Sequence, residues 1–128
     1  IDRVLVDAPC SGLGTLRRNP DLKWRQSPRS VAELQAKQQA ILAAAARLPK
    51  AGGRLVYATC SLLAAENQAV VQAFEAEHGR DFTPLPALDL LQAARVQAAA
   101  DLVEGPFLRL WPHRHRTDGF FAAAWQRR

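Results

Sequence analysis

Two cysteines are the residues of this 128-residue chain most able to do covalent chemistry, and both stand in polar surroundings. Cys10 lies in the segment Asp7-Ala8-Pro9-Cys10-Ser11-Gly12, and Cys60 lies in Ala58-Thr59-Cys60-Ser61. A free cysteine is more often a small buried apolar side chain than a nucleophile. Here each cysteine directly follows an apolar segment, at a point where a side chain can be presented to a ligand. We therefore treat both thiols as candidate nucleophiles.

Metal binding and redox exchange are the other uses of a thiol. The histidines that could join the cysteines in a metal site are His78, His113 and His115, but no C-x-x-C or similar ligand spacing occurs, so no metal is expected. A dithiol redox protein also usually carries C-x-x-C, whereas fifty residues separate these cysteines. No secretory signal is evident, and free thiols in a reducing cytosol are therefore expected, which predicts a cytoplasmic protein.

The elements that must position the thiols can be read from apolar runs and turn residues. Residues 1–6 are a short branched apolar run, typical of a strand buried on both faces of a parallel sheet, and residues 54–59 are predicted to form a second apolar strand. A long helix is expected between them, beginning either at Ser27 with Pro28 or at Ser30 with Glu33. A second helix is expected from about Ala64 to His78, stopping at Gly79.

This order predicts an open α/β sheet, in which ligands bind outside the carboxyl ends of the strands. Asp7, Cys10 and Cys60 should all lie at that edge. Pro9 stiffens the turn that presents Cys10, and Gly12 and Gly14 allow close approach of the backbone to a ligand.

The helices and the tail carry further expectations. The apolar face of the long helix is predicted to hold Val31, Leu34, Ile41, Leu42, Ala45 and Leu48, and the second helix should turn Val70, Val71 and Phe74 inward. Residues 80–105 predict only a short helix around Leu88 to Val96. The segments Phe107–Trp111 and Gly119–Trp125 predict two final strands joined by a basic loop over residues 112–118.

The charge balance favours an anionic partner. Seventeen Lys and Arg against twelve Asp and Glu give a net charge of +5. The basic residues near the predicted catalytic edge are Arg17, Arg18, Lys23, Arg25, Arg114 and Arg116, and they are read as contacts to nucleic-acid phosphates in preference to ordinary surface charge. Trp24 or Trp111 could stack on a base, although either could equally belong to the core. The longest apolar run, Ala40–Ala46, is far too short to span a membrane, and no membrane partner is expected.

The two cysteine motifs together resemble those of the Fmu/Sun family of RNA cytosine-5 methyltransferases. The similarity continues through Arg17-Arg18-Asn19-Pro20-Asp21-Leu22-Lys23-Trp24, Glu66-Asn67, Pro112-His113 and Asp118-Gly119-Phe120-Phe121. It covers nearly the whole chain apart from residues 80–105, and the branch it looks most like is the bacterial small-subunit ribosomal RNA enzyme. The resemblance implies the C-terminal half of a Rossmann-like sheet with helices on its faces, S-adenosylmethionine as cofactor and small-subunit rRNA as partner.

The resemblance also implies roles for three residues. Cys60 would be the nucleophile that adds to carbon-6 of cytosine, so that carbon-5 can attack the methyl group, and Cys10 would assist product release. Asp7 would contact the cofactor or the target base. DNA cytosine-5 methyltransferases use the Pro-Cys cysteine as nucleophile, so the residue pattern alone leaves the opposite assignment of Cys10 and Cys60 open.

The chain reads as a fragment, because it contains no methionine and begins within a predicted strand. The glycine-rich turn and the following acidic residue that hold such a cofactor do not appear in it. Residues 1–128 are therefore expected to be a partial catalytic domain, without its N-terminal cofactor-binding half and an RNA-binding region, and inactive alone. The competing hypothesis is a non-catalytic RNA-binding or ribosome-assembly module with a methyltransferase-like fold.

Overall fold

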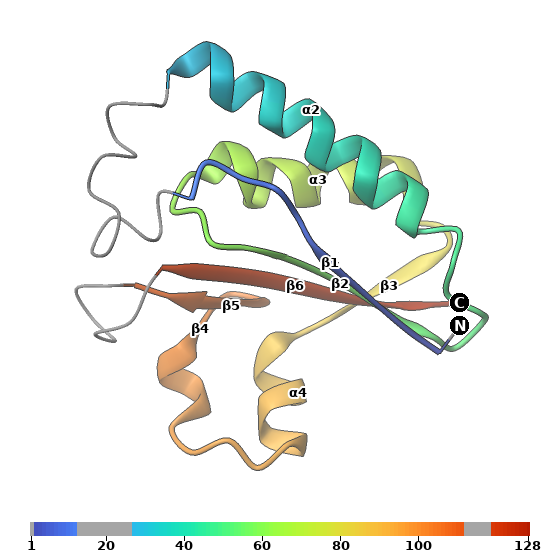
Figure 1. Cartoon of the computed structure of the whole chain (residues 1–128). Coiled ribbons are helices and arrows are strands. Elements are labelled where there is room, and N and C mark those ends of the chain that lie inside the picture. Colours follow the sequence, from blue (N-terminus) through green and yellow to red (C-terminus); the bar gives the residue numbers. More distant parts are fainter. Residues whose placement is uncertain (1, 13–26, 112–118) are drawn as a thin grey trace.

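A mixed sheet forms the centre of the chain (Figure 1). The computed structural model describes residues 2–12, 27–111 and 119–128, and within these ranges the sheet has six strands. They are β1 (Arg3–Asp7), β2 (Arg54–Thr59), β3 (Phe82–Leu85), β4 (Val103–Glu104), β5 (Phe107–Leu110) and β6 (Phe120–Arg127). The strand order is β1-β2-β6-β5-β4, and β3 pairs with β6 as well. The expected α/β class is confirmed.

Helices lie on both faces of this sheet. Figure 1 shows α2 (Pro28–Ala45) and α3 (Gln68–His78) on one face and the short α4 (Ala87–Ala93) on the other. Two 3-10 turns, η2 (Ala64–Glu66) and η3 (Ala99–Leu102), complete the regular elements of the described residues. No helix there is long and apolar enough to cross a membrane.

The strand pairings determine which strand ends share an edge of the sheet. β1 and β2 are parallel, with Asp7 opposite Ala58. β6 runs antiparallel to β2 on one side, and on its other side it pairs first with β5 and then with β3. The antiparallel β5–β6 pair confirms the two strands expected at the end of the chain.

The start of α2 follows the first of the two alternatives. Ser27 is the N-cap, Pro28 occupies the first turn, and Ser27 and Ser30 exchange side-chain to backbone hydrogen bonds. Such a cap satisfies backbone N–H groups that the first turn of a helix leaves without partners. The helix ends at Ala45, four residues before Pro49, whose ring cannot continue a helix.

The buried face of α2 differs in part from its expected apolar stripe. Leu42 and Ala45 are buried as predicted, but Ile41 and Leu48 are 40% and 49% exposed, so their placement in the core was wrong. Gln38 is instead fully buried. Gln38 stands four residues before Leu42 and therefore lies on the same side of the helix, facing the core. The predicted apolar stripe did not include it because only apolar residues were considered.

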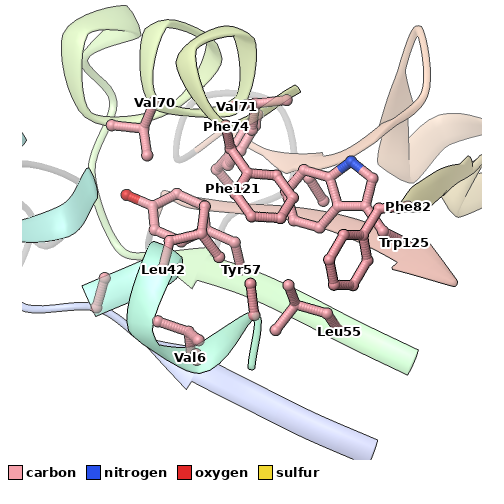
Figure 2. Packing of buried hydrophobic residues seen from close by; sticks show 14 residues of the cluster. Val6, Leu42, Leu55, Tyr57, Val70, Val71, Phe74, Phe82, Phe121 and Trp125 are labelled. Carbon is pink, nitrogen blue, oxygen red and sulfur yellow. The ribbon is translucent and has the colours of Figure 1, made fainter. Parts of the chain in front are cut away.

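Aromatic side chains join the sheet to its helices. Tyr57 of β2 and Phe121 and Trp125 of β6 pack under Phe74 of α3 and Leu42 of α2, as Figure 2 shows. The Phe74 and Trp125 rings are 4.7 Å apart between centroids. Val70, Val71 and Phe74 are all buried, which confirms the inward face predicted for α3. Each such side chain stabilises the fold by about 1.5–3 kcal/mol through burial alone.

Four details differ from the sequence-based expectations. Asn67 breaks the helix expected over 64–78 into η2 and α3, and α4 covers Ala87–Ala93 in place of Leu88–Val96. Strands β3 and β4 lie in a region for which no strand was predicted. β1 was expected to be buried on both faces, but it is the edge strand of the described sheet and its Leu5 is 69% exposed.

Candidate active site

Cys10 and Cys60 lie next to each other at the carboxyl edge of two parallel strands. The chain leaves β1 through Ala8, whose N–H donates to Ala58 O at 3.0 Å, and leaves β2 through Thr59. The two Sγ atoms are 3.3 Å apart, although fifty residues separate the cysteines in the chain. The prediction that the strand ends bring both thiols to one edge is therefore confirmed.

The thiols form a hydrogen-bonded pair and no disulfide. Both cysteines are free, and a disulfide would need a sulfur separation of about 2.05 Å. Both side chains are partly exposed at this edge. One sulfur can donate its proton to the other, so the protonation state of each thiol affects its neighbour.

The surroundings of Cys10 keep that thiol protonated. Burial raises the pKa of Cys10 to about 12, and the hydrogen bond with Cys60 adds to this rise. Near neutral pH Cys10 is therefore a neutral S–H group that can donate to a sulfur beside it. Because the thiolate is the nucleophilic form of cysteine, this environment does not favour Cys10 as the attacking group.

A buried carboxylate lies directly behind the two cysteines. Glu66 of η2 is fully buried, and its Oε1 accepts from Ser11 N at 2.6 Å. Its Oε2 accepts from Ser11 Oγ at 2.7 Å and from Ser61 Oγ. Gln38 Nε2 donates both to Glu66 Oε1 at 3.3 Å and to Pro9 O at 2.9 Å. One carboxylate thus contacts the residue that follows each cysteine.

A second polar group fixes the turn after β2. Thr59 Oγ1 donates to Asn67 Oδ1 at 2.6 Å, and Asn67 Nδ2 donates to Ser61 O at 2.9 Å. Thr59 Oγ1 also accepts from Ser61 N at 3.2 Å. All three residues are buried, so these bonds satisfy groups that would otherwise be costly to remove from water. The backbone on both sides of Cys60 is consequently held in one conformation.

Arg109 supports the same turn from β5. Its Nη2 donates to Leu62 O at 3.0 Å, and its guanidinium lies 4.1 Å from the ring centre of Trp111 and 5.7 Å from that of Phe121. Burial lowers the pKa of Arg109. Trp111 also donates from Nε1 to Glu104 Oε1 at 2.5 Å. Trp111 thus packs on Arg109, but it is only partly buried and does not belong to the hydrophobic core.

The structure describes only some of the remaining predicted site residues. Asp7 is the last residue of β1, and its side chain is exposed at the same edge of the sheet as the cysteines. A cofactor could reach its carboxylate there. Gly12 has a positive φ of 73°, which suits a residue without Cβ in the turn after Cys10. The basic residues Arg17, Arg18, Lys23, Arg25, Arg114 and Arg116 lie outside the described residues, as do Gly14, Trp24, His113 and His115.

Sequence reasoning gave no role to Glu66, Gln38 or Tyr57, the polar residues that connect the cysteine turns to the core. Gln38 offered a signal, because a polar residue inside the apolar face of α2 must find a buried partner. Glu66 offered a weaker signal, because it is an acidic residue only six positions after Cys60. Its pairing with Ser11, 55 residues away, depends on the fold.

Comparison with known proteins agrees with this arrangement. Residues 1–126 match the model of the family described as 16S rRNA methyltransferase RsmB/F. The chain is 47% identical over 123 residues to the "Probable ribosomal RNA small subunit methyltransferase B" of Synechocystis sp., and the match covers 96% of this chain and 26% of that protein. The chain thus spans about a quarter of the length of this relative.

Solved structures share the fold. The crystal structure of PH0851 matches with a TM-score of 0.83 and 38% identity, over 97% of this chain and 26% of that one. A methyltransferase homologue from Pyrococcus horikoshii matches with a TM-score of 0.72 and 29% identity, over 98% of this chain and 39% of that one. With its sequence and its fold both in agreement, the chain belongs to the RsmB/F family of 16S rRNA methyltransferases.

Proposed function

We propose that this chain supplies the two catalytic cysteines of an enzyme that methylates carbon-5 of a cytosine in small-subunit ribosomal RNA. The observation that carries the proposal is the 3.3 Å contact between Cys10 Sγ and Cys60 Sγ at the carboxyl ends of two parallel strands. Open α/β sheets bind their ligands at this edge. Membership of the RsmB/F family supports a methyl-transfer reaction on rRNA.

Cys60 is the proposed nucleophile. Its thiolate adds to carbon-6 of the target cytosine, which raises the electron density on carbon-5 and lets this carbon form a bond to the incoming methyl group. S-adenosylmethionine supplies that methyl group when bound. Carbon-5 then loses its proton to a base, the bond between Cys60 Sγ and carbon-6 breaks, and the aromatic ring is restored with Cys60 leaving as thiolate.

Cys10 is proposed to assist the release step. Its pKa is raised to about 12, mainly by burial, so it stays a hydrogen-bond donor at the pH of the reaction. From a position 3.3 Å from Cys60 Sγ it can stabilise negative charge on that sulfur as the bond to carbon-6 breaks. A thiol held in its protonated form is disfavoured as the attacking group, which supports leaving the nucleophilic role to Cys60, the choice that the residue pattern left open.

Two further contacts complete the proposal. The exposed Asp7 carboxylate is proposed to contact the cofactor or the target base at the sheet edge. Arg17, Arg18 and Lys23 are proposed to bind RNA phosphates, together with Arg25, Arg114 and Arg116. Residues 1–128 cover 26% of the Synechocystis relative, so we propose that they act as one portion of a catalytic domain whose other cofactor and RNA contacts lie elsewhere.

The test separates the roles of the two thiols in the full-length protein incubated with rRNA and cofactor. Cys60→Ala should abolish both methyl transfer and any covalent adduct, because carbon-5 is never activated. Cys10→Ala should still attack and methylate but release slowly, so a protein–RNA adduct should accumulate under denaturing electrophoresis and disappear in the double variant.

Other outcomes would assign the thiols differently. An adduct trapped by Cys60→Ala and none by Cys10→Ala would make Cys10 the nucleophile. Methylation retained in both single variants without any adduct would exclude the covalent mechanism. If neither the unaltered protein nor the variants methylate RNA, although all of them bind it, the chain is better described as a non-catalytic RNA-binding module.

A dithiol redox function remains a second candidate, because one observation favours it. The fifty-residue separation differs from the C-x-x-C spacing of most dithiol redox proteins, yet the fold places the two sulfurs in contact. A redox protein should cycle between dithiol and disulfide without RNA or cofactor. Turnover of a disulfide substrate by the full-length protein, abolished by either cysteine variant, would support that function.

A further inference from the structure

Glu66 is the most deeply buried acidic group of the described residues, and methyl transfer as proposed above does not use it. A carboxylate removed from water is costly unless hydrogen bonds replace its hydration. The partners that the described part of the chain gives this carboxylate are the uncharged donors of Ser11, Ser61 and Gln38. Such an arrangement needs a reason beyond the packing of an apolar core.

The donors belong to the two segments that carry the thiols. Ser11 follows Cys10 directly and contributes both its backbone N–H and its hydroxyl, and Ser61 follows Cys60 directly. Gln38 links Glu66 to the residue that precedes Cys10 as well, because its amide donates both to Glu66 Oε1 and to Pro9 O. The carboxylate is thus the point at which both cysteine turns meet.

The backbone of Glu66 is itself fixed from the core. Tyr57 OH donates to Glu66 O at 2.7 Å, and Tyr57 is a fully buried residue of β2. The position of the carboxylate is therefore set by the sheet and not by the loops that it holds.

From this geometry we propose that Glu66 is the positioning residue that sets the distance between Cys10 Sγ and Cys60 Sγ. It acts through Ser11 and Ser61 and does not contact the reacting atoms itself. Without the carboxylate, the turn after β1 and the turn after β2 lose their shared acceptor. The direct side-chain contact left between Ser11 and Ser61 is the longer one between their hydroxyl oxygens, at 3.4 Å. The geometric part of this proposal stands on the contacts alone, and its consequence for methylation rests on the proposed function.

The rate at which a disulfide forms between Cys10 and Cys60 reports on how close their sulfur atoms are held, and it can be measured without any methylation. Oxidised glutathione reacts with one protein thiolate to give a mixed disulfide and one glutathione thiolate. The second protein thiolate then attacks the mixed disulfide, forms the Cys10–Cys60 bond and releases the second glutathione. Two protein thiols are oxidised and one glutathione disulfide is reduced, so electrons balance. The rate of the second step depends on how often the two sulfurs meet and on the thiolate fraction of the attacking cysteine, so closure is compared across the variants over a pH series.

The variants are Glu66→Ala and Glu66→Gln in the full-length protein, with Glu75→Gln as matched control. Glu75 accepts a hydrogen bond from Trp125 Nε1 at 3.0 Å on α3, so its variant also changes a carboxylate bonded to a buried residue, but one with no bond to either cysteine turn. Mass spectrometry of quenched samples follows the mixed disulfide and the closed disulfide over time. Circular dichroism and thermal melting show whether each variant is folded.

Glu66→Ala should slow closure by about tenfold or more and let the mixed disulfide accumulate, because small displacements of reacting groups cost large factors in rate. Glu66→Gln keeps one acceptor oxygen for Ser11 N but replaces the other by an amide N–H group, toward which the two hydroxyls would have to reverse from donors to acceptors. Closure should therefore slow by roughly three- to tenfold. Glu75→Gln should close at the unaltered rate whatever its melting temperature.

A folded Glu66→Gln variant that closes at the unaltered rate would overturn the proposal, even if Glu66→Ala fails to fold. So would a Glu75→Gln variant that slows closure as much as the Glu66 variants, since the effect would then follow general destabilisation. Failure of the proposed function is a different result. Methylation retained in both cysteine variants would exclude the catalytic roles while leaving the closure rates, and the positioning role, intact.

Discussion

The hydroxyl of Tyr57 donates a hydrogen bond of 2.7 Å to the main-chain oxygen of Glu66. This bond joins the interior of β2 to η2, the turn that follows the candidate nucleophile. Tyr57 is also part of the aromatic packing under α3 in Figure 2. The side chain therefore connects the stability of the core with the geometry of the cysteine pair.

Replacing Tyr57 by Phe should destabilise the fold by about 1–3 kcal/mol, because it keeps the ring but leaves the buried Glu66 oxygen without its donor. Chemical denaturation followed by circular dichroism measures this change. Tyr57→Leu should cost more, since it also removes ring contacts from the core. Equal stability of Tyr57→Phe and the unaltered protein would mean that the hydrogen bond contributes nothing net.

The pKa of about 12 for Cys10 predicts an unusual pH profile for its alkylation. Below this pKa the thiol is protonated, so the reactive thiolate should increase about tenfold for each pH unit. Labelling by iodoacetamide should keep rising through pH 10 in the folded protein. Mass spectrometry of the tryptic peptide of residues 4–17, which contains Cys10, follows it separately from Cys60.

The same peptide in the denatured protein serves as the control. There Cys10 should have an ordinary thiol pKa of about 8.5, and its labelling should level off above roughly pH 9.5. If the folded protein shows the same plateau, burial does not hold Cys10 in its protonated form, and Cys10 is no longer disfavoured as the nucleophile.

Arg109 should stabilise the turn after Cys60. Arg109→Ala removes the donor to Leu62 O and the group packed against the Trp111 ring, and should lower the free energy of unfolding by about 1–3 kcal/mol. Arg109→Met covers the ring again without donating to the carbonyl, so it should recover part of the loss. If Arg109→Met were as unstable as Arg109→Ala, packing on the ring would contribute little.

The sequence predicted the parts of the fold that depend on local patterns. The branched run at residues 54–59 ends where β2 ends, and the Ser27–Pro28 start of α2 follows from capping preferences. Strand β3 could not be predicted in this way. Its sequence contains Pro84, which usually argues against a strand, and it pairs as a short segment beside β5 along β6.

Of the candidate site, the sequence predicted the two cysteines but not the buried groups that hold them. Parallel strands deliver their carboxyl ends to one edge, so the sequence alone places Cys10 and Cys60 together. The carboxylate behind them could not, because its bonds to Ser11 and Ser61 depend on how η2 folds back under the sheet edge. The exposure of Leu5 and Ile41 likewise depends on which elements cover them.

The last prediction concerns the basic residues Arg17, Arg18 and Lys23, whose positions lie outside the described residues. If these residues bind RNA phosphates, changing all three to Ala in the full-length protein should weaken RNA binding and reduce its dependence on salt. Each phosphate contact releases condensed counterions, so the slope of log K against log salt concentration should fall by about 2 to 3. Filter binding or fluorescence anisotropy across a salt series measures both quantities.

A control with the same loss of charge tests whether location matters. Lys50, Arg54 and Arg128 lie at the end of the strands opposite the cysteine pair. Arg54 begins β2, Arg128 follows the last residue of β6, and Lys50 Nζ lies 2.5 Å from Oδ1 of Asp2, the residue before β1. Changing these three to Ala removes the same net charge far from the cysteine pair. It should lower affinity only slightly and leave the salt slope nearly unchanged, because non-local charge is screened beyond about 8–10 Å. Equal slopes for the two triple variants would mean that Arg17, Arg18 and Lys23 act only through the overall charge of the protein, and the RNA path would then have to be sought elsewhere on its surface.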